Sequence, residues 1–291
     1  MNTAGTRNTL KTQKARKISD VPFLFEQDDF SSLFPKEKIP VLFLDFDGTL
    51  SPIVRHPEDA ALYDGMKKVL KRCTSRFTMA VVSGRDMDDV RQRVGIGQII
   101  YAGSHGFHIS GPGGMYMEHE LTDKIVPLLD QVEEQLLKIF PDAPKGIKVE
   151  RKKYAIAVHY RNVEEENLED IRNNIDNVVK QFSNVKTSEG KKIIEVKPDI
   201  DWDKGKAVRW ILDKFDILGN KDVTPVYIGD DTTDEDAFKT LPLNGIGILV
   251  GSHEKPTFAG YRLKDVGEVK TFLQKLYKIR EDAPATIRIH R

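Results

Sequence analysis

The residues best suited to chemistry are two aspartates two positions apart, Asp45 and Asp47, in the segment Asp-Phe-Asp-Gly-Thr at 45–49. They follow a continuous apolar run at 41–44, which is typical of a strand buried on both faces. Ligands of open α/β sheets bind outside the carboxyl ends of the strands. Two carboxylates on one side of a strand repel each other unless a cation or a proton separates their roles. A turn or a helix cap uses similar residues, but a buried strand that ends in this pattern favours a functional site.

A second acidic cluster occupies residues 229–236, which read Gly-Asp-Asp-Thr-Thr-Asp-Glu-Asp and follow an apolar run at 226–228. Acidic residues at a helix N-terminus interact favourably with the helix dipole, but four aspartates and one glutamate exceed what a cap needs. Mg²⁺ binds through one or two carboxylates, water and a substrate phosphate. Together with Asp45 and Asp47, the cluster therefore predicts a site for magnesium and a phosphate group.

Two further segments supply groups that neutralise a phosphate. Ser83 lies in Val-Ser-Gly-Arg at 82–85, after an apolar run and before a helical pattern, and helix N-termini bind phosphate. Lys204 opens a second helical pattern and offers a point charge. Each signal is weak alone, but the four segments in this order indicate one phosphate site.

The elements that position these residues alternate between buried strands and amphipathic helices, which predicts an α/β fold with a doubly wound parallel sheet. Residues 109–198 read differently, with two long helical stripes and strands of alternating polarity, and predict a smaller inserted α+β domain. Folding signals begin near Val21. The expected divisions are a flexible N-terminal tail at 1–35, a core domain at 36–108 and 199–279, the inserted domain at 109–198, and a C-terminal tail at 280–291.

Composition excludes several classes of protein. The 291 residues include 45 basic and 45 acidic side chains, and this balance argues against a dedicated nucleic-acid or membrane-surface protein. The single cysteine, Cys73, excludes an intramolecular disulfide framework and predicts a reducing, cytoplasmic location and a core position. No apolar run approaches the ~18 residues that span a bilayer. The basic N-terminus lacks an apolar core, so a disordered tail is favoured and an organellar targeting segment remains open. No coiled-coil signal is present, so a monomer is expected.

The four segments resemble those of the haloacid-dehalogenase superfamily of phosphohydrolases, in which a cap domain lies between the serine and lysine segments. Finer features are similar to the trehalose-6-phosphate phosphatase family. They include the extended segment at 44–53, Gly-Ser-His-Gly at 103–106, and charged residues of the inserted domain. The resemblance implies a Mg²⁺-dependent phosphatase that converts trehalose 6-phosphate to trehalose and phosphate. It covers residues 45–234, which leaves the N-terminal segment outside it.

The resemblance also implies a role for each matched residue. Asp45 is the expected nucleophile, which forms an aspartyl-phosphate. Asp47 is the expected acid and then base, and Ser83 and Lys204 are expected to hold the phosphoryl oxygens. The remaining expected residues are Asp230, which joins Asp45 and the backbone carbonyl of Asp47 as metal ligands; Asp231 and Asp234, which orient the ligands; and Arg85, Glu150, Lys152, Arg161 and Glu195, which bind the substrate.

Other readings of the same residues remain open. The core segments suit a phosphatase of another sugar phosphate, such as sucrose phosphate, or a phosphomutase, because only the inserted domain discriminates among substrates. A non-catalytic sugar-phosphate sensor is the alternative outside enzymes. The presence of Asp45, Asp47, Lys204 and Asp230 argues against it, since a sensor needs neither nucleophile nor acid. His105 and His159 are expected to be structural rather than catalytic.

Overall fold

The computed structural model describes residues 14–26, 30–140, 146–160, 162–190 and 192–281. The chain divides into two compact units, one of residues Met1–Met115 and Asp203–Arg291 and the other of residues Tyr116–Trp202. The first unit therefore consists of two separate stretches of sequence, and the second is inserted between them.

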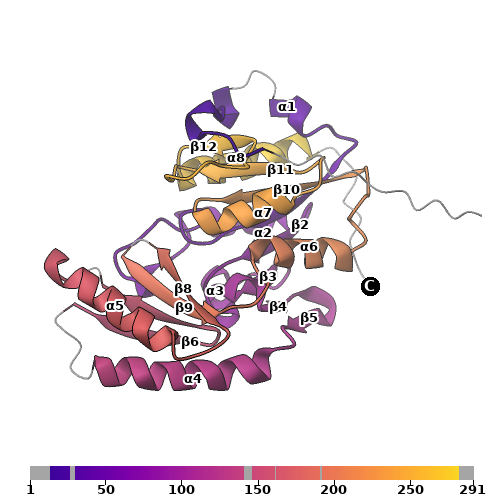
Figure 1. Ribbon diagram of the computed structural model, residues 1–291. Helices are drawn as coiled ribbons and strands as arrows, with labels where there is room; N and C mark the ends of the chain where they lie inside the picture. The colour runs from indigo at the N-terminus through magenta and orange to yellow at the C-terminus, as the bar shows by residue number, and fades with distance from the viewer. Residues whose placement is uncertain (1–13, 27–29, 141–145, 161, 191, 282–291) are drawn as a thin grey trace, which may run out of the picture. The chain divides into compact units, whose positions relative to one another are not determined.

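The first unit is built on a mostly parallel sheet in which strands lie in the order β12-β11-β10-β1-β2-β3-β4 (Figure 1). Only the β3–β4 pair among these is antiparallel. The chain adds β2, β3 and β4 on one side of β1 and then β10, β11 and β12 on the other side, so the sheet is doubly wound, as predicted. The strands are β1 (Ile39–Leu44), β2 (Thr78–Val82), β3 (Ile100–Gly103), β4 (His108–Ser110), β10 (Val223–Gly229), β11 (Ile246–Val250) and β12 (Tyr261–Leu263).

Helices cover the sheet of the first unit on both faces. The longer ones are α2 (Met66–Cys73), α3 (Met87–Val94), α6 (Lys204–Lys214), α7 (Glu235–Thr240) and α8 (Val266–Ile279). Helices α2, α3 and α8 contribute buried side chains to the same cluster as Leu42 and Leu44. Phe43 is equally buried but lies outside this cluster, because successive side chains of a strand point to opposite faces of the sheet. Helices α6 and α7 pack against each other and lie in front of the sheet in Figure 1. Every side chain of β1 after Ile39 is therefore buried.

Cys73 lies in the apolar core, as predicted. It is the last residue of α2, is fully buried, and burial raises the pKa of its thiol to about 12. At neutral pH the thiol is therefore protonated and behaves as a small apolar side chain.

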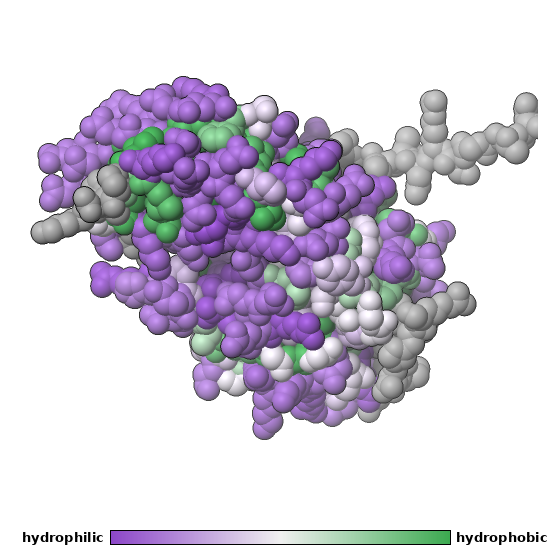
Figure 2. Space-filling model, turned by 90° about the horizontal axis from the view of Figure 1, so that it is seen from below, coloured by the Kyte–Doolittle hydropathy of each residue, from purple (hydrophilic) through white to green (hydrophobic). Residues whose placement is uncertain are grey.

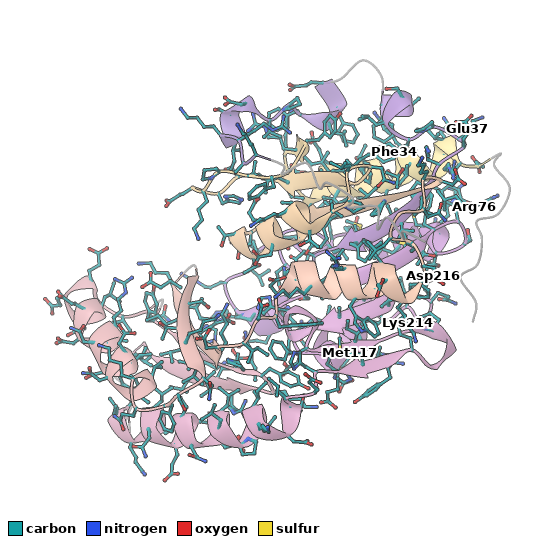
Figure 3. The ribbon with its side chains drawn as sticks, turned by 45° about the vertical axis from the view of Figure 1, so that its right-hand side comes forward. Phe34, Glu37, Arg76, Met117, Lys214 and Asp216 are labelled. Atoms are coloured by element: carbon teal, nitrogen blue, oxygen red, sulfur yellow. The ribbon has the colours of Figure 1, made fainter. Side chains whose placement is uncertain are left out.

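The described part of the segment at 1–35, expected from the sequence to be a flexible tail, packs against the first unit. It contains the short helices η1 (Ile18–Asp20), η2 (Leu24–Glu26) and α1 (Phe30–Leu33). Leu24 and Phe34 are buried, and the rings of Phe34, labelled in Figure 3, and Phe272 of α8 lie 5.6 Å apart. The contact joins residues more than two hundred positions apart, so no local pattern reveals it.

The second unit is an α+β structure with a four-stranded antiparallel sheet in the order β6-β7-β9-β8. Helices α4 and α5 lie against one face of this sheet (Figure 1). The buried residues alternate along β9, as expected for a sheet covered on one face. The elements are β5 (Tyr116–Glu118), α4 (Thr122–Ile139), β6 (Lys148–Lys152), β7 (Ala155–His159), α5 (Leu168–Val179), β8 (Val185–Gly190) and β9 (Ile193–Pro198).

The surface carries few large apolar side chains. The face in Figure 2 is mainly hydrophilic, with apolar residues in small groups. Among the described residues, no helix has both the length and the apolar character needed to cross a membrane.

Candidate active site

Two aspartates meet at the carboxyl ends of adjacent parallel strands of the first unit. Asp45 directly follows β1 and Asp230 directly follows β10, and Leu44 pairs with Ile228. Carboxylate oxygens of Asp45, Asp230 and Asp234 all lie within 4.8 Å of one another. The structure thus brings together the two acidic clusters predicted from the sequence.

Gly48 makes this approach possible. It turns the chain after β1 with a left-handed φ of +77°, and a Cβ atom there would lie 2.0 Å from the Oδ2 atom of Asp230. Any other residue would displace this carboxylate as well as strain the turn. The glycine of the 45–49 segment is therefore needed to hold Asp230 beside Asp45.

Lys204 bridges two of the carboxylates. It is the first residue of α6, which Asp203 caps by accepting a hydrogen bond from the backbone N–H of Lys206 at 2.8 Å. Its Nζ donates to Oδ1 of Asp45 at 2.8 Å and to Oδ1 of Asp234 at 2.7 Å, and its side chain is only 3% exposed. Burial alone lowers the pKa of Lys204, but Asp234 and Asp45 outweigh it and raise the pKa well above its ordinary value. Lys204 is therefore a fixed positive charge.

Asp234 is held by four hydrogen bonds and is fully buried. Its Oδ1 accepts from Lys204 and from the hydroxyl of Tyr227 at 2.7 Å each, and its Oδ2 accepts from the backbone N–H groups of Asp230 at 3.0 Å and Asp231 at 2.9 Å. Because a carboxylate has about four acceptor sites, Asp234 has no vacant acceptor site. It positions Lys204 and the 230–231 backbone.

The charge of this cluster fits a divalent cation. Burial raises the pKa of Asp45 well above its ordinary value; Lys204 opposes this rise, and the nearby Asp234 and Asp230 add to it. The three carboxylates lie beside a single lysine, and the donors that they offer are all hard oxygens. The residues present therefore fit a magnesium-type metal, with Asp45 and Asp230 as the side chains that can bind it.

Asp47 lies outside this acidic group and forms a two-point ion pair with Arg85. Nε of Arg85 donates to Oδ2 of Asp47 at 2.6 Å, and Nη2 donates to Oδ1 at 2.8 Å. Arg85 also donates to Asp89 at 3.0 Å and to the carbonyl of Pro57 at 2.9 Å. The guanidinium of Arg85 therefore donates four hydrogen bonds within the first unit, two of them to Asp47.

Ser83 lies where the loops after β2 and β3 join. It is buried; its Oγ accepts from the backbone N–H of Arg85 at 3.1 Å, and its carbonyl accepts from that of His105 at 2.8 Å. Ser104 and His105 both have left-handed φ angles, of 49° and 56°. Non-glycine residues in this conformation cluster at functional sites. The Ser83 hydroxyl retains a proton that it can donate.

Asp231 caps the short helix η7 (Thr232–Asp234). Its Oδ1 accepts from the backbone N–H of Thr232 at 2.7 Å. It shapes the loop that carries Asp230 and Asp234, and this placement agrees with an orienting role.

In the second unit, Glu150, Lys152 and Glu195 share one face of the sheet. Glu150 pairs with Ala157, and Ala157 pairs with Glu195, so Glu150, Ala157 and Glu195 lie in one row across β6, β7 and β9. Lys152, two residues from Glu150, is on the same face. Arg151, between them, bonds to Asp130 of α4, which places α4 on the opposite face. The charged face is therefore the one away from α4, with an alanine at its centre.

Ion pairs join these charged residues. Lys152 Nζ lies 2.8 Å from Oε1 of Glu195, and Nε2 of His159 lies 2.7 Å from Oε2 of Glu150. The hydrogen bond from His159 lowers the pKa of Glu150. His159, expected to be structural, therefore orients a predicted substrate-binding residue. Arg161 lies outside the described residues.

Sequence reasoning missed Tyr227 and Asp89. Tyr227 reads as one more apolar residue of β10, yet it is fully buried and its hydroxyl bonds to Asp234. Burial and the negative charge of Asp234 raise the pKa of this hydroxyl well above its ordinary value. A buried tyrosine hydroxyl needs a hydrogen-bond partner, so its position three residues before the acidic segment was an available signal. Nothing in the sequence marks Asp89 as a partner of Arg85.

Comparison with known proteins agrees with this geometry. A family model described as trehalose-phosphatase matches residues 43–267. The probable trehalose-phosphate phosphatase 2 of Oryza sativa subsp. japonica is 39% identical over 264 residues, which cover 83% of this chain and 69% of the relative.

Solved structures show the same fold. A trehalose-6-phosphate phosphatase related protein is 25% identical, with a TM-score of 0.72, over 84% of this chain and all of its own. A haloacid dehalogenase-like hydrolase from Bacteroides thetaiotaomicron has a TM-score of 0.58 at 14% identity, over 83% of this chain and all of its own. The second likeness shows the fold alone.

Proposed function

Because the chain belongs to the trehalose-phosphatase family, we propose that it hydrolyses trehalose 6-phosphate to trehalose and phosphate by way of an aspartyl-phosphate. The observation that carries this proposal is the buried network of Asp45, Lys204 and Asp234 beside Asp230. It places one carboxylate with limited hydrogen bonding next to a fixed cation at the ligand-binding end of the sheet.

Asp45 is the nucleophile in this mechanism. A carboxylate oxygen of Asp45 attacks phosphorus; the bond to the sugar oxygen breaks, and that oxygen takes up a proton. Water then attacks the aspartyl-phosphate, which releases phosphate and restores the Asp45 carboxylate. Lys204 and the Ser83 hydroxyl hold phosphoryl oxygens, because positioning and charge neutralisation supply most of the catalysis of phosphoryl transfer.

Asp47 supplies the proton and later removes one from the attacking water. An acid must be protonated to donate, and both carboxylate oxygens of Asp47 accept a hydrogen bond from Arg85. In this proposal Arg85 is a positioning residue, and its hydrogen bonds to Asp47 must weaken during the catalytic cycle. Direct contact of Arg85 with the substrate, which the family resemblance implies, stays a prediction.

Magnesium completes the proposed site. Asp45, Asp230 and the backbone carbonyl of Asp47 would hold it, with Asp231 and Asp234 shaping the loop. When bound, it neutralises phosphate charge and polarises the phosphoryl group. The hard oxygen donors of Asp45 and Asp230 beside each other support a divalent ion such as Mg²⁺.

The second unit binds the sugar in this proposal. Glu150, Lys152 and Glu195 present oxygens and an ammonium group on one sheet face, and sugar hydroxyls both donate to and accept from such groups. Arg161 is proposed as a fourth ligand because it matches the family pattern.

We place the protein in the cytoplasm as a monomer. The support is a single buried cysteine and a surface with few large apolar residues. Size-exclusion chromatography with light scattering tests the oligomeric state.

Phosphate release across a panel of sugar phosphates, with and without Mg²⁺, tests the whole proposal. We expect trehalose 6-phosphate to be hydrolysed fastest and chelation to abolish turnover. Preference for sucrose phosphate would move the chain to the alternative phosphatase. Binding of a sugar phosphate without release in the presence of Mg²⁺ would indicate the sensor.

A further inference from the structure

A cavity of about 300 Å³ lies in the first unit, away from the aspartate cluster. It is lined by the start of β11 and β12, including Ile246 and Tyr261. Ile246 pairs with Val226, four residues before Asp230, so the cavity lies near the amino ends of these strands. At about 3.3 Å per residue, it is about 13 Å along the strand from the acidic cluster.

Positive charge lines one side of this cavity. Lys14 and Arg16 both contribute to its wall, and no described residue that lines it is acidic. Arg16 is fixed in place, since its backbone exchanges two hydrogen bonds of 2.8 Å with Thr257 and its Nη2 lies 3.3 Å from the carbonyl of Ala259. The two cations therefore face a space that suits an anionic group.

Aromatic rings and bare backbone form the rest of the wall. Phe258 and Tyr261 are half-buried and present apolar surface, and Gly245, Gly247 and Gly260 carry no side chain. Small-molecule sites combine such apolar surface with a few placed polar groups, in volumes that begin at about 300 Å³. A compound with a ring and an anionic group matches both parts of the wall.

Further hydrogen bonds hold the loop that carries Phe258. The backbone N–H of Phe258 donates to Oε2 of Glu235 at 2.7 Å, and Oε1 of Glu235 lies 2.9 Å from Nε2 of His253. These bonds tie the loop before β12 to the start of α7. The cavity is therefore largely preformed, which lowers the entropic cost of binding.

We propose that this cavity is a second ligand site, which binds a small phosphorylated compound that carries a ring. Its cations take the phosphate and its aromatic side chains take the ring. The site is independent of the proposed phosphatase reaction, because it uses none of the residues assigned to catalysis.

Phenylphosphonate is the probe, since it combines a ring with a dianion and its P–C bond cannot be hydrolysed. Titration of protein with ¹⁵N-labelled glycine is expected to shift the amide signals of Gly245, Gly247 and Gly260. Gly48 and Gly229 report separately on the acidic site. Methylphosphonate and benzyl alcohol, which each lack one half of the probe, should bind at least about tenfold more weakly. Absence of shifts at the three cavity glycines would overturn the proposal.

Matched variants locate the site further. The double change Lys14→Gln, Arg16→Gln should weaken phenylphosphonate binding at least about tenfold, because charge-assisted hydrogen bonds are lost. Lys17→Gln, an exposed neighbour outside the cavity, should leave binding unchanged. Equal binding by the double variant and the native chain would refute the charge assignment.

A filling variant tests the cavity itself. A Cβ at Gly260 would meet only the carbonyl of Gly247, at 3.8 Å, so Gly260→Met fits the backbone and adds a side chain beside the cavity. We expect it to abolish the shifts at Gly245 and Gly247. Gly97→Met is the control, because a Cβ there meets nothing within 4 Å and Gly97 does not line the cavity. Undiminished binding by Gly260→Met in a protein with native thermal stability would contradict the site.

Discussion

The charged clusters of the two units differ most in exposure. In the first unit the side chains of Asp45, Lys204 and Asp234 are 0–6% exposed, whereas Lys152 and Glu195 of the second unit are 20–22% exposed. Movement of buried groups that make several hydrogen bonds costs much free energy. Such groups therefore suit a reaction that needs charges at fixed positions. Partly exposed ion pairs contribute little stability, so their groups can exchange partners with ligand hydroxyls. The difference indicates that one cluster is built for chemistry and the other for binding.

The largest effect should come from Asp45. Asp45→Asn keeps the shape of the side chain but removes the attacking charge, so we expect phosphate release to fall at least about a thousandfold. Circular dichroism should show an unchanged fold. If a tenth of native turnover remains, Asp45 is not the nucleophile and the buried cluster is not the chemical one.

Asp234 and Asp230 separate structure from metal binding within the first cluster. Asp234→Asn leaves Lys204 with one partner fewer, and breaking such a buried pair should lower the free energy of unfolding by about 3–5 kcal/mol. Asp230→Asn removes a carboxylate that repels Asp45, so metal-free protein should be no less stable. It should nevertheless lose Mg²⁺-dependent turnover. Urea unfolding and Mg²⁺ titration of both variants make the comparison, and matching losses in both would contradict the division of roles.

Asp47→Asn tests the acid. We expect turnover of trehalose 6-phosphate to fall about a hundredfold, within the range for general acid catalysis. A substrate with a good leaving group, such as p-nitrophenyl phosphate, should be affected less because it needs no proton. Equal losses would assign Asp47 to the site's structure rather than to proton transfer.

The second cluster should affect specificity at a smaller scale. Glu150→Ala, Lys152→Ala and Glu195→Ala should each lower kcat/KM for trehalose 6-phosphate at least about tenfold, because one charged hydrogen-bonding partner is lost. Hydrolysis of p-nitrophenyl phosphate should stay within about twofold, since catalytic residues are untouched. Glu164→Ala, at an exposed site of the same unit, is the control. A parallel fall for both substrates would mean that these residues support the fold.

The smallest effect should be on stability in the second cluster. A double-mutant cycle with Lys152→Met and Glu195→Gln should give a coupling below about 1 kcal/mol in urea unfolding, as is usual for partly exposed pairs. A coupling of several kcal/mol would make this pair resemble Lys204 and Asp234 and would erase the contrast between the clusters.

Local patterns in the sequence were sufficient for much of the fold. Apolar runs predicted β1, β2 and β10, and these strands end just before Asp45, Ser83 and Asp230. The short strands β4 and β12 were not predicted, because three residues are too few to show the alternation of apolar and polar side chains. The packing of the described N-terminal segment was not predicted, because its partners lie on α8 and β12, at the far end of the chain.

The site could be predicted as a list of residues but not as a set of contacts. The positions of Asp45 and Asp230 after apolar runs predicted that acidic groups gather at one edge of the sheet, and the structure places these two side chains together. The pairing of Arg85 with Asp47 depends on how two loops meet, and the saturation of Asp234 depends on a tyrosine hidden in an apolar strand. Such contacts are decided by tertiary packing, which single-sequence patterns do not contain.

The N-terminal segment also covers an edge of the first sheet. β12 pairs with β11 on one side; on the other, the backbone N–H of Arg262 donates to the carbonyl of Pro22 at 3.0 Å, and the Arg262 guanidinium lies 3.9 Å from the centre of the Phe23 ring. An uncovered edge strand offers free backbone groups to other chains and promotes aggregation. The segment at 22–23 occupies that position within its own molecule. Its packing therefore protects the protein against edge-to-edge association at high concentration, a benefit that measurements of turnover alone would not detect.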